Sequence, residues 1–217
     1  MDDAACSLIY EILAATHPHA TDPEPFFSNP FQVLVLTILS AQTTDKQVWA
    51  LREPLFAAYP TPAALADADP AELEAIVRPT GYYHAKARHL IGAARMLAAE
   101  YGGEVPARME DLVRLPGVGR KTANIVLYHA FGRNEGVAVD THVLRLAKRI
   151  GLSDHADPGA VERDLMTCLP PERWGPVTDL LIAHGRAVCT ARRPRCEVCP
   201  LSPHCRYYRE VCLAGPG

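Results

Sequence analysis

The sequence predicts an all-α protein, and three observations support that prediction. Apolar residues recur at helical spacing along most of the 217-residue chain, as in Leu8, Ile9, Ile12 and Leu13. Alternating apolar and polar runs, which form half-buried strands, are nearly absent. Prolines and glycines stand where the helical pattern breaks. A chain of this length is long enough to bury a core and to divide into two lobes.

The expected helices follow one another along the whole chain. The first is marked by Leu8–Leu13, and the second is a nearly continuous apolar run, Phe31–Leu39, that starts after Pro30. Proline suits the first turn of a helix, and an apolar surface on most sides predicts that this helix is buried at the centre of a core. Further helices are expected at Asp45–Ala58, Pro70–Val77, His84–Tyr101, Arg108–Arg114, Arg120–Phe131, Thr141–Ile150, Pro158–Cys168 and Glu172–His184.

Composition restricts the function classes. The net charge is −3 and the pI is about 6.3, so binding to nucleic acid would need a local basic surface. No apolar run approaches the ~20 residues that a membrane helix needs. The N-terminus also lacks the basic segment followed by an apolar stretch that marks a secretory signal. We therefore expect a cytoplasmic protein with reduced thiols and no membrane partner.

A glycine turn between two expected helices is the first candidate site. Residues 115–119 read Leu-Pro-Gly-Val-Gly, and Arg120-Lys121-Thr122 opens the next helix. Glycine lets the main chain approach a ligand closely, and a helix N-terminus offers unpaired N–H donors with a partial positive charge. A simple connection between two helices is the alternative. Lys121 is either a phosphate clamp or, because the helix dipole repels its ammonium, a partly desolvated nucleophilic amine.

Asp140, which follows the apolar run Val137–Val139, is the second candidate. It stands directly before an apolar helix, so its side chain is suited to be an N-cap. A carboxylate at this position can also accept a proton from a lysine or stabilise a cationic sugar in a transition state. The two roles are compatible with each other.

Four of the seven cysteines lie close together near the C-terminus. Their spacing, C-x6-C-x2-C-x5-C, predicts a metal site formed by Cys189, Cys196, Cys199 and Cys205. A zinc ion is compatible with this set, but only one pair is close, which favours an iron–sulfur cluster. Residues 186–209 hold six arginines against one acidic residue, so the metal would lie in a basic loop. The remaining cysteines are expected to be core or surface thiols: Cys6, Cys168 and Cys212.

Together these motifs resemble the endonuclease III family of DNA base-excision repair glycosylases. The resemblance rests on residues 115–124 (LPGVGRKTAN), residues 139–143 (VDTHV) and the cysteine tail, and it extends to residues 39–45 (LSAQTTD). It covers nearly the whole chain. It implies a six-helix lobe with a helix-hairpin-helix over residues 22–132, and a second lobe, residues 1–21 plus 133–217, with a [4Fe-4S] cluster. The resemblance also implies a DNA-binding cleft between the lobes.

The resemblance assigns roles residue by residue. Lys121 resembles the family's nucleophile, Asp140 its essential carboxylate, and the four clustered cysteines its cluster ligands. The implied reaction removes an oxidised pyrimidine from duplex DNA and cleaves the strand 3′ of the site through a lysine Schiff base. The damaged nucleotide must leave the helix, and Gln42 resembles a residue that fills the hole.

The implied partner is double-stranded DNA that contains damaged bases or abasic sites, bound by a monomer in the cytoplasm at the nucleoid. The other implied DNA contacts are Tyr82, Gly117, Val118, Gly119, Arg120, Thr122, His142, Arg145, Arg149 and Arg193. The backbone amides of residues 117–122 would bind phosphates. For Arg145 and Arg149, solvation at the protein surface is the alternative.

The loop Gly81–Lys86 departs from the family pattern. Leucine is common in the family where Tyr82 stands, whereas Gly-Tyr-Tyr is similar to the related adenine glycosylase branch. A tyrosine wedge can stack on a base as well as fill space, and packing under the loop is the alternative. That branch has a glutamate where Thr37 stands and lacks the hairpin lysine that Lys121 supplies. A monofunctional adenine glycosylase is therefore disfavoured, but the lesion preference stays open.

Two other function classes remain compatible with the residues. One is a non-enzymatic DNA-binding module with a zinc-stabilised tail, which predicts a colourless protein that binds DNA without cleaving it. The other is a redox protein in which the cluster is the working centre and the hairpin only a connection. The arginines around the cysteines weigh against the redox protein, because they suggest a loop that faces DNA.

Overall fold

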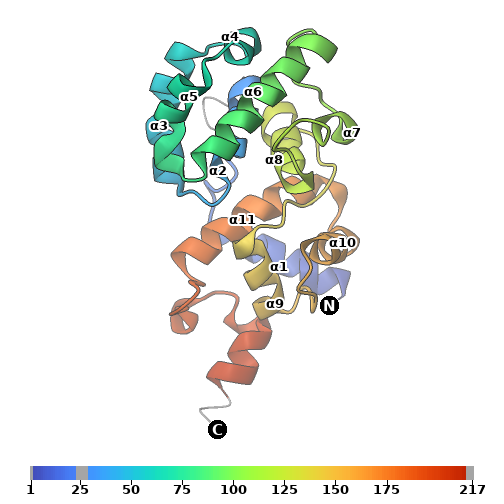
Figure 1. Cartoon of the computed structure of the whole chain (residues 1–217). Helices are drawn as coiled ribbons and strands as arrows, with labels where there is room; N and C mark the ends of the chain where they lie inside the picture. Colours follow the sequence, from blue (N-terminus) through green and yellow to red (C-terminus); the bar gives the residue numbers. More distant parts are fainter. Residues whose placement is uncertain (1, 23–28, 214–217) are drawn as a thin grey trace. The chain divides into compact units, whose positions relative to one another are not determined.

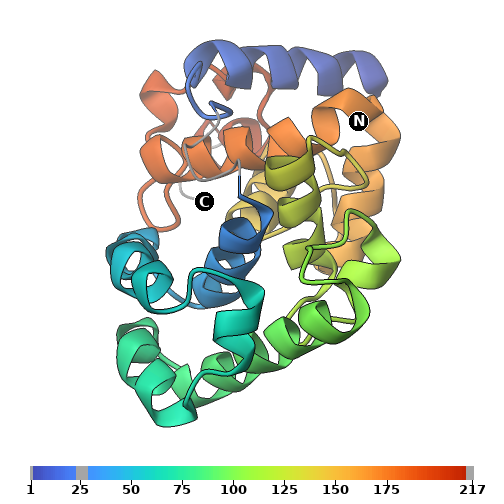
Figure 2. The same ribbon diagram turned by 90° about the horizontal axis from the view of Figure 1, so that it is seen from above.

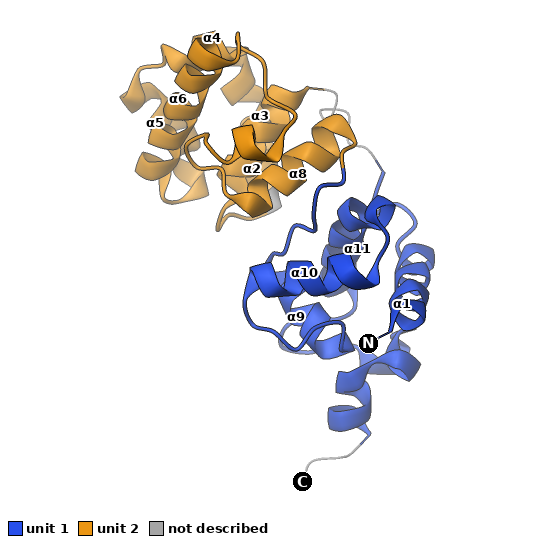
Figure 3. Cartoon of the chain, turned by 90° about the vertical axis from the view of Figure 1, so that its right-hand side faces the viewer, with its two compact units in different colours: residues 1–22, 134–217 blue, residues 23–133 orange. Residues whose placement is uncertain are grey.

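The protein is all-α. A computed structural model describes residues 2–22 and 29–213, and every regular element within those residues is helical (Figure 1). The predicted fold class is therefore confirmed. By their internal contacts the residues form two compact units, coloured separately in Figure 3: unit 1 comprises residues 1–22 and 134–217, and unit 2 comprises residues 23–133. Each boundary falls one residue after the expected one.

Unit 2 contains the helices from the first half of the chain and the glycine hairpin. Its elements are α2 (Pro30–Ser40), α3 (Asp45–Ala58), α4 (Pro62–Ala66), α5 (Pro70–Val77), the 3-10 turn η2 (Arg78–Thr80), α6 (Tyr83–Glu100), α7 (Met109–Leu112) and α8 (Arg120–Phe131). The central helix is α2, which starts at Pro30 with the side chain of Asn29 accepting a hydrogen bond from the amide of Gln32. Seven of its eleven residues are buried, because α3, α6 and α8 pack around it, so the predicted central helix is confirmed.

Unit 1 joins the N-terminal helix to the second half of the chain. Its elements are α1 (Asp3–Thr16), α9 (Thr141–Ile150), α10 (Pro158–Cys168), the 3-10 turn η3 (Pro171–Arg173), α11 (Trp174–Ala187), the 3-10 turns η4 (Cys196–Val198) and η5 (Ser202–His204), and one turn of π-helix, η6 (Tyr208–Cys212). Helix α11 packs against both α9 and α1, and Figure 2 shows α1 running alongside α11. The unit has its own apolar core, separate from that of unit 2.

Some elements differ from the sequence prediction. The short helix α4 was not expected, although Thr61 caps it, with Oγ1 accepting from the amide of Ala64 at 3.2 Å, and Pro62 fits its first turn. The helix expected at Glu172–His184 begins two residues later, at Trp174, after a 3-10 turn. None of the described helices is long and apolar enough to cross a membrane.

Candidate functional site

The glycine hairpin lies between α7 and α8, and it packs closely on α6. Its turn is closed by a hydrogen bond from the amide of Val118 to the carbonyl of Leu115, 3.0 Å long. Gly117 has φ +81°, and a Cβ atom there would lie 2.8 Å from Cβ of His89 on α6. Glycine is therefore required at this position for its dihedral angles and for its size.

The hairpin leads directly into the N-terminus of α8, which no side chain caps within the described residues. Gly119 occupies the N-cap position, and its carbonyl accepts from the amide of Ala123 at 2.9 Å. A helix N-terminus without a side-chain cap is suited to bind an anion. Lys121, the second residue of α8, is exposed to solvent. Solvent therefore reaches this side chain in the protein without DNA, and partial desolvation of its amine stays a prediction.

Asp140 caps α9 in unit 1. Its Oδ1 atom accepts a hydrogen bond from the amide of Val143 at 2.8 Å, and the carboxylate is half-buried. The N-cap prediction is confirmed. The hydrogen bond engages one oxygen, and the other oxygen of the carboxylate can still act on a ligand.

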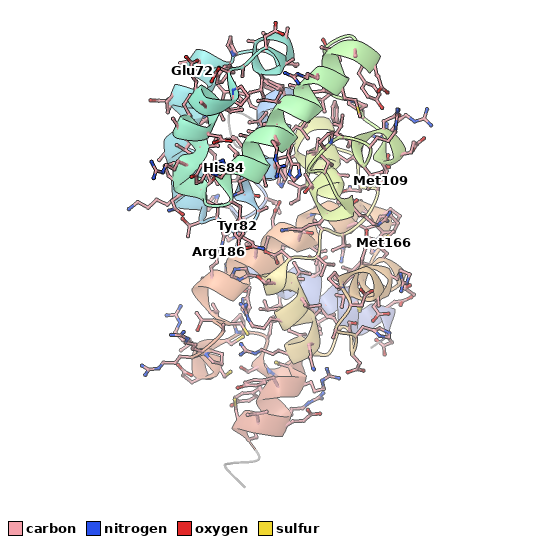
Figure 4. All side chains as sticks on the ribbon, in the orientation of Figure 1. Glu72, Tyr82, His84, Met109, Met166 and Arg186 are labelled. Atoms are coloured by element: carbon pink, nitrogen blue, oxygen red, sulfur yellow. A yellow bond between two sulfur atoms is a disulfide. The ribbon has the colours of Figure 1, made fainter. Side chains whose placement is uncertain are left out.

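Two loops in unit 2 carry residues in the left-handed region of backbone conformation. Gln42, which follows α2, has φ 54°, and Tyr82, directly before α6, has φ 48°. They are the only non-glycine residues with positive φ in the described part of the chain. Tyr82 is 70% exposed and lies at the N-terminal end of α6 (Figure 4). Packing of Tyr82 under the loop, the alternative to a wedge, is therefore wrong.

The four clustered cysteines line one cavity in unit 1 and form no disulfide. Apolar residues, among them Ile150 and Leu201, complete the wall. Arg149 lies beside the cavity, with Nη1 donating to Sγ of Cys189 at 3.3 Å. Four thiolates around one apolar cavity, with a cation that offsets part of their charge, fit an iron–sulfur cluster. This set of donors therefore suits the expected cofactor.

Arg145 and Arg149 hold the cysteine loop in place. The guanidinium of Arg145 donates to the carbonyls of Gly185 and Cys189 at 3.2 and 3.1 Å. That of Arg149 donates to the carbonyls of Thr190 and Ala191, both at 2.8 Å. The alternative of simple surface solvation is therefore wrong for these two arginines, and their expected contact with DNA stays a prediction. His142 lies beside Arg145, at 3.2 Å between Nδ1 and Nη2, whereas Arg193 is exposed on the loop.

The remaining cysteines differ from the expectation in one respect. Cys6 of α1 and Cys168 of α10 are both buried, and they are joined by a disulfide. The prediction of two separate thiols is wrong, because packing of α1 against α10 brings together two residues that are 162 positions apart in sequence. Cys212 is an exposed thiol, as expected.

Two buried polar side chains near these sites were not predicted. His184 on α11 lies between the N-terminal helix and the cysteines: its Nδ1 is 3.0 Å from Nε2 of His17, and its Nε2 is 3.4 Å from Sγ of Cys199. Lys86 on α6 is 5% exposed and donates three hydrogen bonds within unit 2. Sequence offered one signal for Lys86, its place in the atypical loop Gly81–Lys86.

Comparison with known proteins places these features in a family. The model of the HhH-GPD superfamily base excision DNA repair protein matches residues 35–171, and that of the iron-sulfur binding domain of endonuclease III matches residues 189–205. Endonuclease III of Synechocystis sp. is 48% identical over 194 residues, which are 89% of this chain and 88% of that protein. Endonuclease III of Bacillus subtilis is 43% identical over 190 residues, 87% of this chain and 86% of that protein.

A solved structure gives the same result. The structure of a trapped endonuclease III–DNA covalent intermediate superimposes with a TM-score of 0.89 and 38% identity, and the match covers 96% of this chain and 98% of that chain. The cofactor is the [4Fe-4S] cluster that the resemblance implied. With a hairpin motif, an iron-sulfur binding domain and relatives that match over nearly its whole length, the chain belongs to the endonuclease III family.

Proposed function

We propose that this protein is a bifunctional DNA glycosylase and abasic-site lyase that removes oxidised pyrimidines from duplex DNA. The observation that supports this most is the N-terminus of α8, where uncapped amides and the exposed amine of Lys121 share one helical turn. Phosphates bind readily to such amides, and a nearby primary amine can attack a sugar carbon. Likeness to an endonuclease III trapped covalently on DNA supports the same reaction.

In the proposed reaction Lys121 forms a covalent intermediate with the DNA. Its neutral Nζ attacks C1′ of the damaged nucleotide, and the base leaves with the electron pair of the glycosidic bond. The sugar ring opens to a Schiff base between Nζ and C1′. Loss of a proton from C2′ then breaks the C3′–O bond, which cleaves the strand 3′ of the site.

Asp140 would assist at two points. Its carboxylate accepts the proton that Lys121 must lose before it attacks, and it stabilises the positive charge that develops on the sugar. One oxygen can stay bound to the amide of Val143 during these steps. Lys121 and Asp140 belong to different compact units, so the reaction requires residues of both.

Gln42 and Tyr82 would keep the DNA open while the reaction takes place. A stacked base is out of reach of any active site, so the nucleotide has to turn out of the duplex. In the proposed complex Gln42 fills the vacated space and Tyr82 wedges against the opposite strand. The exposure of Tyr82 supports this role, since its ring is accessible to a base.

The remaining contacts would be with the DNA backbone. Amides of Gly117, Gly119, Arg120 and Thr122 would bind phosphates near the lesion, whereas the amide of Val118 already donates to Leu115 and so is not a phosphate ligand as expected. Side chains from unit 1 would add to these contacts: His142, Arg145, Arg149 and Arg193. Cys189, Cys196, Cys199 and Cys205 would hold the cluster, and these bonds would cross-link their loop and so position Arg193. We expect the protein to act as a monomer in the cytoplasm, where its DNA substrate is.

Borohydride trapping on a duplex with one abasic site tests this proposal. Borohydride reduces a Schiff base to a stable amine, so the wild-type protein should form a covalent adduct that survives denaturation. Lys121→Gln should form none while it still binds the duplex. If the wild-type protein forms no adduct, or if Lys121→Gln forms one at the wild-type rate, the mechanism is wrong.

A further inference from the structure

The buried ammonium of Lys86 connects the two loops that carry Gln42 and Tyr82. Its Nζ lies 2.9 Å from the carbonyl oxygen of Leu39, in the last turn of α2, and 2.6 Å from Oγ1 of Thr43, in the loop after α2. It also lies 2.8 Å from the carbonyl oxygen of Thr80, which precedes Tyr82 by two residues. One side chain therefore holds the loop after α2 and the loop before α6.

The hydrogen-bond partners of Lys86 suit a charged side chain. A carbonyl oxygen can only accept, so the carbonyls of Leu39 and Thr80 each take one hydrogen from Nζ. The hydroxyl of Thr43 donates its own hydrogen to the carbonyl of Thr80, at 2.6 Å, and so it accepts the third from Nζ. Three acceptors match the three hydrogens of an ammonium.

Two of the acceptors stand where a helix presents negative charge. Leu39 is in the last turn of α2, and Thr80 ends η2, so their carbonyls have no partner further along the helix. Terminal carbonyls of this kind are ready to accept from a cation, although burial lowers the pKa of Lys86. This arrangement accounts for a buried lysine whose acceptors are all neutral oxygens.

The loops that Lys86 joins are the two places where the described chain places a non-glycine residue at positive φ. Residues with a Cβ adopt that conformation rarely, and they keep it only where surrounding contacts impose it. In the first loop, Thr43 is hydrogen-bonded to Lys86 and is adjacent to Gln42. In the second loop, Thr80 is hydrogen-bonded to Lys86 and precedes Gly81 and Tyr82. The contacts of Lys86 are thus placed to impose both conformations at once.

We propose that Lys86 is a positioning residue for opening the duplex: it fixes the spacing and the backbone conformation of Gln42 and Tyr82, so that both enter the DNA together. The inference rests on the proposed function of those two residues. It makes opening of the base pair, rather than the covalent chemistry at Lys121, the step that depends on Lys86.

Lys86→Met tests this inference, because methionine keeps the apolar stem and removes the ammonium. Excision of an oxidised pyrimidine paired with a normal base should slow by about tenfold to a hundredfold, as expected for misplaced side chains. Strand cleavage at a pre-formed abasic site, which has no base to unpair, should slow by no more than about threefold. Equal loss on both substrates would overturn the proposal, since it would show a general defect.

A second comparison separates positioning from folding. In a Gln42→Ala/Tyr82→Ala background, adding Lys86→Met should slow excision by less than about twofold, because the residues it positions are gone. A further tenfold loss in that background would contradict the proposal. If Lys86→Met does not fold, Thr43→Val, which removes only the hydroxyl link, should reduce excision selectively in the same way.

Arg95→Met is the matched control. Arg95 is another cation on α6 whose Nε donates to a backbone carbonyl, that of Ala66 at 3.0 Å, but it contacts neither loop. Its ratio of excision to abasic-site cleavage should equal that of the wild-type protein. A wild-type protein inactive on both substrates would refute the proposed function itself, whereas an active protein with equal losses in Lys86→Met refutes only the role of Lys86.

Discussion

Asp140 illustrates how one side chain can serve the fold and the reaction. Its Oδ1 caps α9 in the free protein, and the proposed chemistry uses the negative charge of the same carboxylate. A good cap needs only an acceptor oxygen, whereas proton transfer and charge stabilisation need the acid itself. Replacement by an amide therefore separates the two roles.

Asp140→Asn should keep the stability of the protein and lose its activity. We expect the free energy of unfolding to change by less than about 1 kcal/mol, since asparagine caps helices nearly as well as aspartate. Strand cleavage at an abasic site should fall on the order of a hundredfold or more. Denaturant unfolding and a cleavage assay on the same samples measure both quantities.

Asp140→Ala is the control, because it removes the cap as well, at a cost of about 1 kcal/mol in stability. An Asp140→Asn protein with wild-type cleavage would show that the carboxylate is only a cap.

We expect the substrate preference to depend on a single residue, Tyr82. An aromatic ring stacks on a base, and leucine fills space without stacking. Tyr82→Leu should therefore keep activity on abasic sites and change the relative rates on a panel of duplexes, each with one modified base. The relative rates are the informative quantity, since a stability change would lower all of them alike. If Tyr82→Leu left the order of preference among the modified bases unchanged, the proposed wedge role of Tyr82 would be wrong.

At the scale of an element, the hairpin offers two glycines with different requirements. Gly117 has φ +81° and lies against His89, whereas Gly119 has φ −96°, and a Cβ atom there would have no other atom within 4 Å. Gly117→Ala should lower the free energy of unfolding by about 1–3 kcal/mol. Gly119→Ala should leave it unchanged within about 1 kcal/mol but weaken DNA binding, since its Cβ would stand where a phosphate approaches.

Thermal unfolding and DNA-binding titrations on the two variants measure these effects. Equal destabilisation by both alanines would mean that the turn does not distinguish its glycines as the structure indicates.

The cysteine loop depends on a cation from α9. Arg149 binds the carbonyls of Thr190 and Ala191 and touches Cys189. Arg149→Met should speed the loss of the visible absorbance of the cluster in the presence of an iron chelator, because the loop loses three hydrogen bonds. Lys148→Met, an exposed neighbour on the same helix, is the control and should lose the cluster at the wild-type rate. Equal rates for both variants would show that Arg149 does not retain the cluster.

Helix positions could be predicted where periodicity and caps agree. The bounds expected for α3, α5, α8, α9 and α10 are those observed, since each has a proline, a glycine or a polar residue at an end. Periodicity failed for α4, whose five residues are too few to show a helical repeat. It also gave no warning of the disulfide between Cys6 and Cys168, which depends on contacts between distant helices.

Only the parts of the site that lie within short sequence motifs could be predicted. The hairpin, Asp140 and the clustered cysteines each lie within a short stretch of sequence. The roles of Lys86, Arg145 and Arg149 depend on backbone carbonyls that are 6 to 47 residues away. A pattern of side chains does not show which backbone carbonyls will lie near these cations. The left-handed conformations of Gln42 and Tyr82 could not be predicted either, because they too depend on contacts between residues that are distant in sequence.

At the scale of the whole molecule, binding to DNA has to depend on positive charge that is concentrated locally, because positive charge is not abundant overall. The chain carries a net charge of −3, yet the proposed substrate is a polyanion. Cations and amides without a side-chain cap are instead concentrated locally, at the start of α8 and around the cysteine loop. Each unit contributes one of the two groups proposed to act on the sugar, so neither unit alone is expected to be active.

Identification of the residue bound to DNA tests the central claim most directly. The wild-type protein would be reduced with borohydride on an abasic duplex, digested with nuclease and protease, and examined by mass spectrometry for the peptide that carries the sugar remnant. We predict that the remnant is on Nζ of Lys121, in the peptide that begins the helix after the glycine hairpin. A remnant on another lysine or on the N-terminal amine would contradict the account.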